Sequence, residues 1–340
     1  MTDNQSKVLQ MVQHVAEGQS FSEDQARQFF GHVVNGDVDD LLLSSALTAL
    51  KVRGETPGEL AGAAMALLDS AKPFPKPEFE FADVVGTGGD GFNTINLSTI
   101  SAITAATCGA KIIKHGNRSI SSVSGSFDLL EKLGVDFSVS AETARQQVTE
   151  HGICFLYAPN YHPGVRHAST ARKTLKVRTI FNLLGPLVNP ARPPRMVLGV
   201  ADYSLLSPIA TVLARLGCQH ALVVHGSKTD EVAIHGPTSV VELKQGKLNQ
   251  FELTVEDLGA VPHSLDDLVC HEADLSHQRS MAVLAGQGSE AEQAAVGVNV
   301  SLILKLFGKE DLKNNYALAR ESLSAGRPME LIQQLVQSQS

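Results

Sequence analysis

The sequence has no tryptophan, only four tyrosines, and only four cysteines among its 340 residues. The cysteines lie far apart and form no C-x-x-C pair, so a disulfide framework is not expected. Three of them have apolar neighbours, where a free cysteine behaves as a small hydrophobe. We interpret all four, Cys108, Cys154, Cys218 and Cys270, as reduced residues of a cytoplasmic protein.

Positive charge is also in short supply, with 28 Lys and Arg against 36 Asp and Glu and a net charge of -8. This balance argues against a general nucleic-acid or membrane-surface binder, which would carry a basic face. No apolar run approaches the ~20 residues of a membrane span. The amino terminus, residues 1–6, lacks the basic and apolar regions of a signal peptide. The length and composition are those of a globular protein of roughly two domains.

Residues 1–72 show only helical patterns, which predicts a small helical domain. Thr56 followed three residues later by Glu59 predicts a capped helix start. The run 72–77 holds three prolines and cannot continue a helix, because proline lacks the N–H donor. We therefore place the clearest domain boundary there.

From residue 76 onward short apolar strands alternate with helices. Such alternation implies an α/β domain with a mainly parallel central sheet covered by helices on both faces. Residues 240–243 and 251–253 predict a hairpin instead. Residues 163–190 have no strand signal, and we expect a helical insertion that packs back on residues 1–72. The small domain is then discontinuous, and residues 76–162 and 191–340 form the α/β domain.

A glycine-rich stretch, 86–91, matches G-x-G-x-x-G between a strand and a helix. Such a match indicates a dinucleotide-binding turn, or simply a glycine loop between two elements. Three details argue against a dinucleotide. Asp90 would face pyrophosphate with like charge, residues 93–96 delay the helix start, and the second strand ends in Lys114 and His115 where a ribose-binding acid is expected.

A phosphorylated sugar fits this stretch better. The glycines let the backbone approach a ligand closely, and the amides of residues 96–99 lie at a helix start, which favours phosphate. Asp90 can then hold ribose hydroxyls. The hydroxyl of Ser98 can bind Mg²⁺, as the Ser or Thr of a P-loop does.

A basic turn, 114–119, follows the second strand at its carboxyl end, the edge where open α/β sheets bind ligands. Read alone it could be a solvated loop. The serine-rich run 121–126 adds a second potential anion nest before another helix. A charge pair at ~4 Å is worth on the order of 4 kcal/mol, so Lys114 can offset one phosphate charge but not a whole diphosphate. A metal ion is implied.

The adjacent acids Asp230 and Glu231 follow a strand in a glycine-bearing region. They are candidate Mg²⁺ ligands, although adjacent acids are often only surface decoration. Arg172, in the expected insertion, has the planar fork that binds a carboxylate, or else belongs to an exposed helical face. His162 precedes a proline and is typical of a packed structural residue.

Taken together these motifs are similar to the anthranilate phosphoribosyltransferase family, whose members couple anthranilate to phosphoribosyl pyrophosphate in tryptophan synthesis. The resemblance covers essentially the whole chain. It departs at Gly164-Val165, where the family pattern has Ala-Met. It rests on Val85-Gly86-Thr87-Gly88-Gly89-Asp90, Asn96-Leu97-Ser98-Thr99, Lys114-His115-Gly116-Asn117-Arg118-Ser119, Phe181-Asn182-Leu183-Leu184-Gly185-Pro186 and Asp230-Glu231.

The resemblance implies a homodimer with its site in the cleft between a helical and an α/β domain. It implies two Mg²⁺ ions per subunit, held by Ser98, Asp230 and Glu231. Anthranilate would be bound by Gly86, Asn117, His162 and Arg172. Phosphoribosyl pyrophosphate would be bound by Gly86, Gly89, Asp90, Thr94, Asn96, Leu97, Ser98, Thr99, Lys114, His115, Gly116, Asn117, Arg118, Ser119, Ile120, Ser121, Ser122 and Ser126.

The expected chemistry needs no acid–base pair, because an aryl amine is already neutral near pH 7. The harder task is to separate pyrophosphate from the anomeric carbon, which metal charge and positioning assist. Two rivals are a pyrimidine nucleoside phosphorylase, of similar architecture, and a non-enzymatic nucleic-acid-binding relative.

Overall fold

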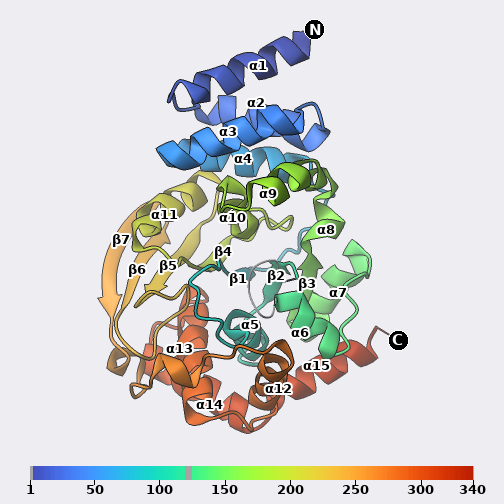
Figure 1. Cartoon of the computed structure of the whole chain (residues 1–340). Coiled ribbons are helices and arrows are strands. Elements are labelled where there is room, and N and C mark those ends of the chain that lie inside the picture. The colour runs from blue at the N-terminus through green and yellow to red at the C-terminus, as the bar shows by residue number, and fades with distance from the viewer. Residues whose placement is uncertain (1–2, 119–124, 340) are drawn as a thin grey trace.

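The structure is a computed structural model that describes residues 3–118 and 125–339. Four helices form a layer at one end of the molecule (Figure 1). Both α2 and α4 begin with a capping box, and the one at Thr56 and Glu59 confirms the expected helix start. The four helices are α1 (Asp3–Ala16), α2 (Glu23–Asn35), α3 (Asp40–Arg53) and α4 (Pro57–Asp69).

A seven-stranded sheet of order β3-β2-β1-β4-β5-β6-β7 forms the centre of the chain. The five strands from β3 to β5 are parallel, and β6 and β7 form an antiparallel hairpin, as expected. The order reverses between β1 and β4, so their carboxyl ends form a topological switch point. The strands are β1 (Ala82–Gly86), β2 (Ile112–Gly116), β3 (Ile153–Tyr157), β4 (Arg195–Gly199), β5 (His220–Gly226), β6 (Thr238–Lys244) and β7 (Lys247–Leu253).

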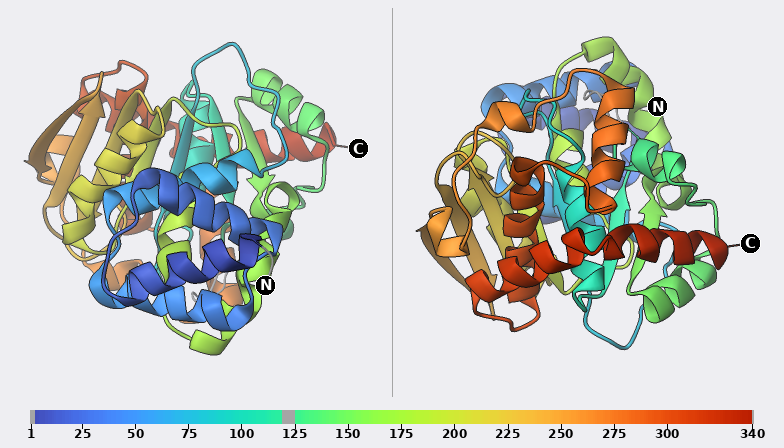
Figure 2. Two further views of the ribbon diagram at one scale, coloured as in Figure 1. Left: turned by 90° about the horizontal axis from the view of Figure 1, so that it is seen from above. Right: turned by 90° about the horizontal axis from the view of Figure 1, so that it is seen from below.

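Helices cover both faces of the sheet, which confirms the predicted α/β class. Alternate strand residues point to opposite cores, with Val84 and Val197 in one and Met196 and Leu198 in the other. Figure 2 shows the amino-terminal helices and the carboxyl-terminal helices on opposite sides. The covering helices are α5 (Leu97–Thr107), α6 (Ser126–Lys132), α7 (Ala141–His151), α8 (Ala158–Tyr161), α11 (Leu206–Arg215), α12 (Ala273–Leu284), α13 (Glu290–Leu306), α14 (Leu312–Ser324) and α15 (Arg327–Gln337). Among the described helices, none is both long and apolar enough to span a bilayer.

The segment 163–190 is helical and packs on the first helices. Its apolar side chains share a core with α2, and the rings of Phe30 and Phe181 meet edge-to-face at 5.8 Å. Gly164 allows this approach, since a Cβ there would lie 2.6 Å from the carbonyl oxygen of Val34. The alanine of the family pattern would therefore need a shift of α2. The elements are the 3-10 helices Pro163–Ala168 and Gly185–Leu187 with α9 (Ser169–Leu175) and α10 (Ile180–Leu184).

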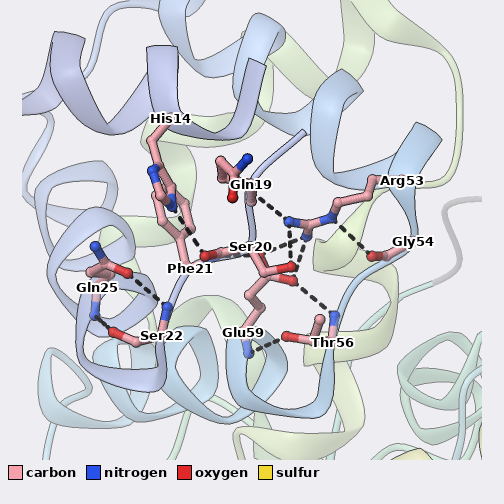
Figure 3. Close-up of polar contacts among 10 residues, drawn as sticks. All are labelled: His14, Gln19, Ser20, Phe21, Ser22, Gln25, Arg53, Gly54, Thr56 and Glu59. Atoms are coloured by element: carbon pink, nitrogen blue, oxygen red, sulfur yellow. Dashed lines mark hydrogen bonds and ion pairs between the residues drawn. The ribbon is translucent and has the colours of Figure 1, made fainter. Parts of the chain in front are cut away.

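A buried ion pair fixes the helical layer (Figure 3). Glu59 is fully buried, and its carboxylate oxygens accept from Nη2 of Arg53 at 2.6 and 2.5 Å. The same carboxylate accepts the N–H groups of Phe21 and Thr56 at 2.9 and 2.8 Å. A buried pair is tolerated only when its hydrogen bonds are satisfied. Here they tie the α1–α2 link to the ends of α3 and α4.

Candidate active site

Three strands end in glycine where a single acidic segment crosses them. A Cβ on Gly86 of β1 would lie 2.2 Å from Oδ2 of Asp230, and one on Gly199 of β4 would lie 1.6 Å from the Asp230 carbonyl oxygen. A Cβ on Gly226 of β5 would lie 2.2 Å from the carbonyl oxygen of Glu231. Gly86 and Gly199 pair directly across the two strands. The glycines thus let the acidic segment lie against the switch point, where open α/β sheets bind ligands.

Gly199→Ala tests this close approach. The added methyl group meets backbone, so the Asp230 segment must move, and a 1 Å misplacement of a catalytic group costs about a hundredfold. We expect kcat to fall by about that factor while Gly31→Ala, on an open face of α2, leaves it unchanged. Steady-state kinetics of the two variants check this; equal rates would show that the segment can retreat without cost.

The two acids form a buried acidic pair whose ionised forms are disfavoured. Burial raises the pKa of Asp230 to about 6, the charge of Asp90 adds to the effect, and the N–H of Gly88, 2.6 Å from Oδ2, opposes it. Burial likewise raises the pKa of Glu231 well above its usual range, with Asp230 adding and Lys114 opposing. A bound cation stabilises the ionised forms of both carboxylates.

Ser98 and Lys114 lie beside Asp230 and Glu231, and we call these four residues the acidic corner. Lys114 on β2 is buried, and its Nζ donates to the Val84 carbonyl and, at 3.4 Å, to Oγ of Ser98. The backbone of Ser98 in turn hydrogen-bonds to Glu231. The structure therefore brings together the three predicted metal ligands. Within the described ranges no cluster of three His, Cys, Asp or Glu side chains suits a metal. Two carboxylates that leave positions for substrate phosphate oxygens are the arrangement Mg²⁺ favours.

Asp83 interacts electrostatically with Lys114 and is hydrogen-bonded by Asn189, and the sequence patterns did not predict a role for either residue. Asp83 is buried; burial raises its pKa to about 6 while Lys114 and Asn189 oppose that shift. Its Oδ1 accepts the N–H of His115 at 3.3 Å, and Nδ2 of Asn189 donates to its Oδ2 at 2.9 Å. The same amide nitrogen donates to the Ile113 carbonyl at 2.8 Å. In the sequence, the one indication of a role for Asp83 was its position as a carboxylate inside an apolar strand.

The glycine loop leads into α5 as expected. Gly88, Gly89 and Gly91 have φ of 61°, 80° and 82°, a region that favours glycine. Helix α5 begins at Leu97 after the N-cap residue Asn96, which confirms the delayed start. The amides of this first turn, including those of Ser98 and Thr99, thus lie beside the loop, and Thr94 precedes them in a bridge to Val269.

The basic turn after β2 comes close to the start of α6. A Cβ on Gly116 would lie 3.6 Å from Oγ of Ser126. Asn117 is exposed and accepts the N–H of Arg118. Arg118 makes two bonds of 2.7 Å to Glu131, which raises the pKa of its guanidinium. The predicted ligands Ser119, Ile120, Ser121 and Ser122 lie outside the described residues.

His162 lies just before the insertion and Arg172 lies within it. His162 is buried, its Nε2 lies 2.7 Å from the Val188 carbonyl, and its ring meets that of His115 edge-to-face at 5.4 Å. Arg172 on α9 is half-buried over the ring of Phe181 at 5.2 Å. Burial lowers the pKa of Arg172, and no carboxylate of the described chain pairs with it. Its planar fork is therefore available to a carboxylate ligand.

A histidine buried in the site makes stability depend on pH. Burial first, then the neighbouring His162 and Lys114, lower the pKa of His115 to about 3. As pH falls through 6.5, His115 takes up a proton in the unfolded chain, but in the folded chain it stays neutral until about pH 3. The stability present above pH 6.5 is therefore lost on acidification.

We expect His115 to account for about 2 kcal/mol of the stability lost between pH 7 and pH 5. His115→Asn removes that share of the pH dependence of the free energy of unfolding measured in urea, whereas the exposed His271→Asn does not. Identical slopes for wild type and His115→Asn would contradict a buried neutral imidazole.

A helical layer beside an α/β domain, with glycine loops and paired acids at the switch point of the sheet, defines a transferase of phosphorylated sugars. The sequence profile of the glycosyl transferase family a/b domain matches residues 78–329, and that of its helical bundle domain matches residues 9–71. An anthranilate phosphoribosyltransferase of Vibrio parahaemolyticus is 50% identical over 96% of this chain and 98% of its own.

Solved structures agree with this assignment. The anthranilate phosphoribosyltransferase of Thermus thermophilus has a TM-score of 0.90 at 37% identity, covering 96% of this chain and 98% of that one. The Saccharomyces cerevisiae enzyme in complex with phosphoribosyl pyrophosphate and Mg has a TM-score of 0.89 at 28% identity, covering 98% of both chains. The chain belongs to the anthranilate phosphoribosyltransferase family.

Proposed function

We propose that this protein transfers the 5-phosphoribosyl group of phosphoribosyl pyrophosphate to the amine of anthranilate, a step of tryptophan biosynthesis. The products are N-(5-phosphoribosyl)anthranilate and pyrophosphate. The observation that carries the proposal is the placement of Asp230 and Glu231 over the β1–β4 switch point, beside Lys114 and Ser98. The named activity of relatives about 50% identical supports it.

Phosphoribosyl pyrophosphate would lie between the glycine loop and the basic turn. The amides at the start of α5 and Lys114 face its phosphates, Asp90 faces the ribose hydroxyls, and Ser126 reaches in from the second loop. Ser98, Asp230 and Glu231 would hold Mg²⁺, two ions per subunit. When bound, Mg²⁺ supplies positive charge to the departing pyrophosphate.

Anthranilate would lie on the side of the insertion, with Arg172 on its carboxylate and Gly86, Asn117 and His162 around its ring. The amine is neutral near pH 7 and attacks the anomeric carbon directly, so a single displacement inverts that centre. His115 is kept neutral by its lowered pKa of about 3 and is no proton donor at pH 7. The protein groups therefore act by charge and position.

The direct test mixes purified protein with both substrates and Mg²⁺ and measures released pyrophosphate. Stoichiometric pyrophosphate and loss of free anthranilate support the proposal. No pyrophosphate release would overturn it, and phosphorolysis of a pyrimidine nucleoside would identify the rival phosphorylase. A salt-titrated gel shift tests the nucleic-acid-binding alternative.

A homodimer is proposed through the outer face of α3. Leu41 and Val52 are 77% and 82% exposed and lie three helical turns apart on one face, and Val177 after α9 is 48% exposed. Large apolar side chains left exposed on one helix face are candidates for an interface. Leu41→Asp with Val52→Asp is expected to shift the sedimenting species from dimer to monomer, while Leu275→Asp, exposed on α12, does not. A wild-type monomer would contradict the proposal.

The division into domains is proposed as residues 1–72 with 163–190, and 76–162 with 191–340. The packing of the insertion on the first helices, as in the edge-to-face contact of Phe181 with Phe30, supports it. We also propose that the protein works in the cytoplasm, which its four free cysteines support.

A further inference from the structure

Arg178 holds the glycine loop from the side of the insertion. It lies in the short link between α9 and α10, two residues after Lys176, whose φ is 51°. Its Nη1 donates to the Gly88 carbonyl at 3.0 Å and its Nη2 to the Thr87 carbonyl at 3.3 Å. The two nitrogens of one planar guanidinium thus hold two successive carbonyl groups.

The same stretch of backbone is held on its other side by Asp230. Oδ2 of Asp230 accepts the N–H of Gly88 at 2.6 Å, while Arg178 binds the Thr87 carbonyl of that same peptide group. The Thr87–Gly88 peptide is therefore fixed at both ends, one by a predicted metal ligand and the other by the insertion. The positive charge of Arg178 also lowers the pKa of Asp230, opposing the effect of burial.

The guanidinium of Arg178 lies in close contact with Gly89. A Cβ at this position would lie 1.2 Å from Nη1 and 2.4 Å from Cζ of Arg178. Any side chain at Gly89 must displace the arginine. The glycine is thus required here by the contact with Arg178 as well as by its φ of 80°.

We propose that Arg178 is a positioning residue, which fixes the glycine loop and Asp230 in the geometry that binds phosphoribosyl pyrophosphate and Mg²⁺. It acts through the loop and Asp230 and does not touch the reacting atoms. The inference rests on the proposed function.

The test compares Arg178→Met, which keeps length but loses every donor, with Arg178→Lys, which keeps the charge. Lys173→Met, an exposed cation of the same insertion, is the matched control. Losing hydrogen bonds from a charged group is expected to raise the Kd of phosphoribosyl pyrophosphate in Mg²⁺ by about tenfold to a hundredfold in Arg178→Met. The KM for anthranilate changes by less than about threefold, because Arg172 keeps its place. Arg178→Lys recovers part of the affinity.

Calorimetry and kinetics distinguish the possible failures. If wild type neither binds phosphoribosyl pyrophosphate nor releases pyrophosphate, the proposed function fails. If wild type does both and Arg178→Met has the same Kd and Mg²⁺ dependence, the positioning role fails. A rise in both KM values together with a lower Tm in all Arg178 variants would show a merely structural contact and also overturn it. The Gly89→Ala variant should reproduce the loss, and adding Arg178→Met to it should cost little more.

Discussion

The double variant Asp230→Asn with Glu231→Gln should lose about a thousandfold or more in kcat/KM, because the metal contributes several kcal/mol to stabilising the departing pyrophosphate. Both changes keep shape and remove charge from the acidic corner at the β1–β4 switch point. The remaining activity should show a strongly raised Mg²⁺ requirement. Steady-state rates over a Mg²⁺ titration measure both effects.

The chain offers a matched control in Asp266 and Asp267, an adjacent and exposed acidic pair. Asp266→Asn with Asp267→Asn removes the same charge from the surface and should leave kcat and the Mg²⁺ dependence unchanged. An unaltered Mg²⁺ titration in the Asp230 and Glu231 variant would exclude these residues as metal ligands.

Arg172→Met should raise the KM for anthranilate by about a hundredfold while changing that for phosphoribosyl pyrophosphate little. The guanidinium is half-buried over Phe181 without a carboxylate partner among the described residues, so a bound carboxylate would supply its missing charge-assisted bonds. The KM of Arg172→Lys for anthranilate should lie between those of wild type and Arg172→Met, since a lysine keeps the charge but cannot form the bidentate pair.

The measurement is a pair of KM values for each variant at saturating co-substrate, with Lys173→Met as the control for charge on α9. Equal increases in both KM values would remove the carboxylate role from Arg172. An unchanged anthranilate KM would place the carboxylate elsewhere in the site.

Much of the fold was predictable because local sequence patterns determine where its helices and strands begin and end. Each of the signals used depends only on a few neighbouring residues. They are the capping box at Thr56, the prolines after residue 72 and the alternation of strands with helices. Helix α12 was not expected, because its buried face includes Ser276, His277 and Ser280 and shows no apolar period. Helix α15 was also missed, although Ile332 and Leu335 are buried at helical spacing.

The site was predictable wherever its residues form short runs. The structure brings Ser98, Lys114, Asp230 and Glu231 together, although more than a hundred residues separate the two halves, because β1, β4 and β5 end at one edge. Roles that depend on one long-range contact could not be predicted. Asn189 and Arg178 act through backbone carbonyls far along the chain, and no spacing in the sequence records such contacts.

The most direct test of the central claim is titration calorimetry of phosphoribosyl pyrophosphate into the wild-type protein, with Mg²⁺ and with Mg²⁺ chelated. Binding at the acidic corner predicts tight association in Mg²⁺ and at least about a tenfold loss of affinity without it. Anthranilate added to the Mg²⁺ complex should then release pyrophosphate. Equal affinity with and without Mg²⁺, or no binding in either, would contradict the site described for Asp230 and Glu231.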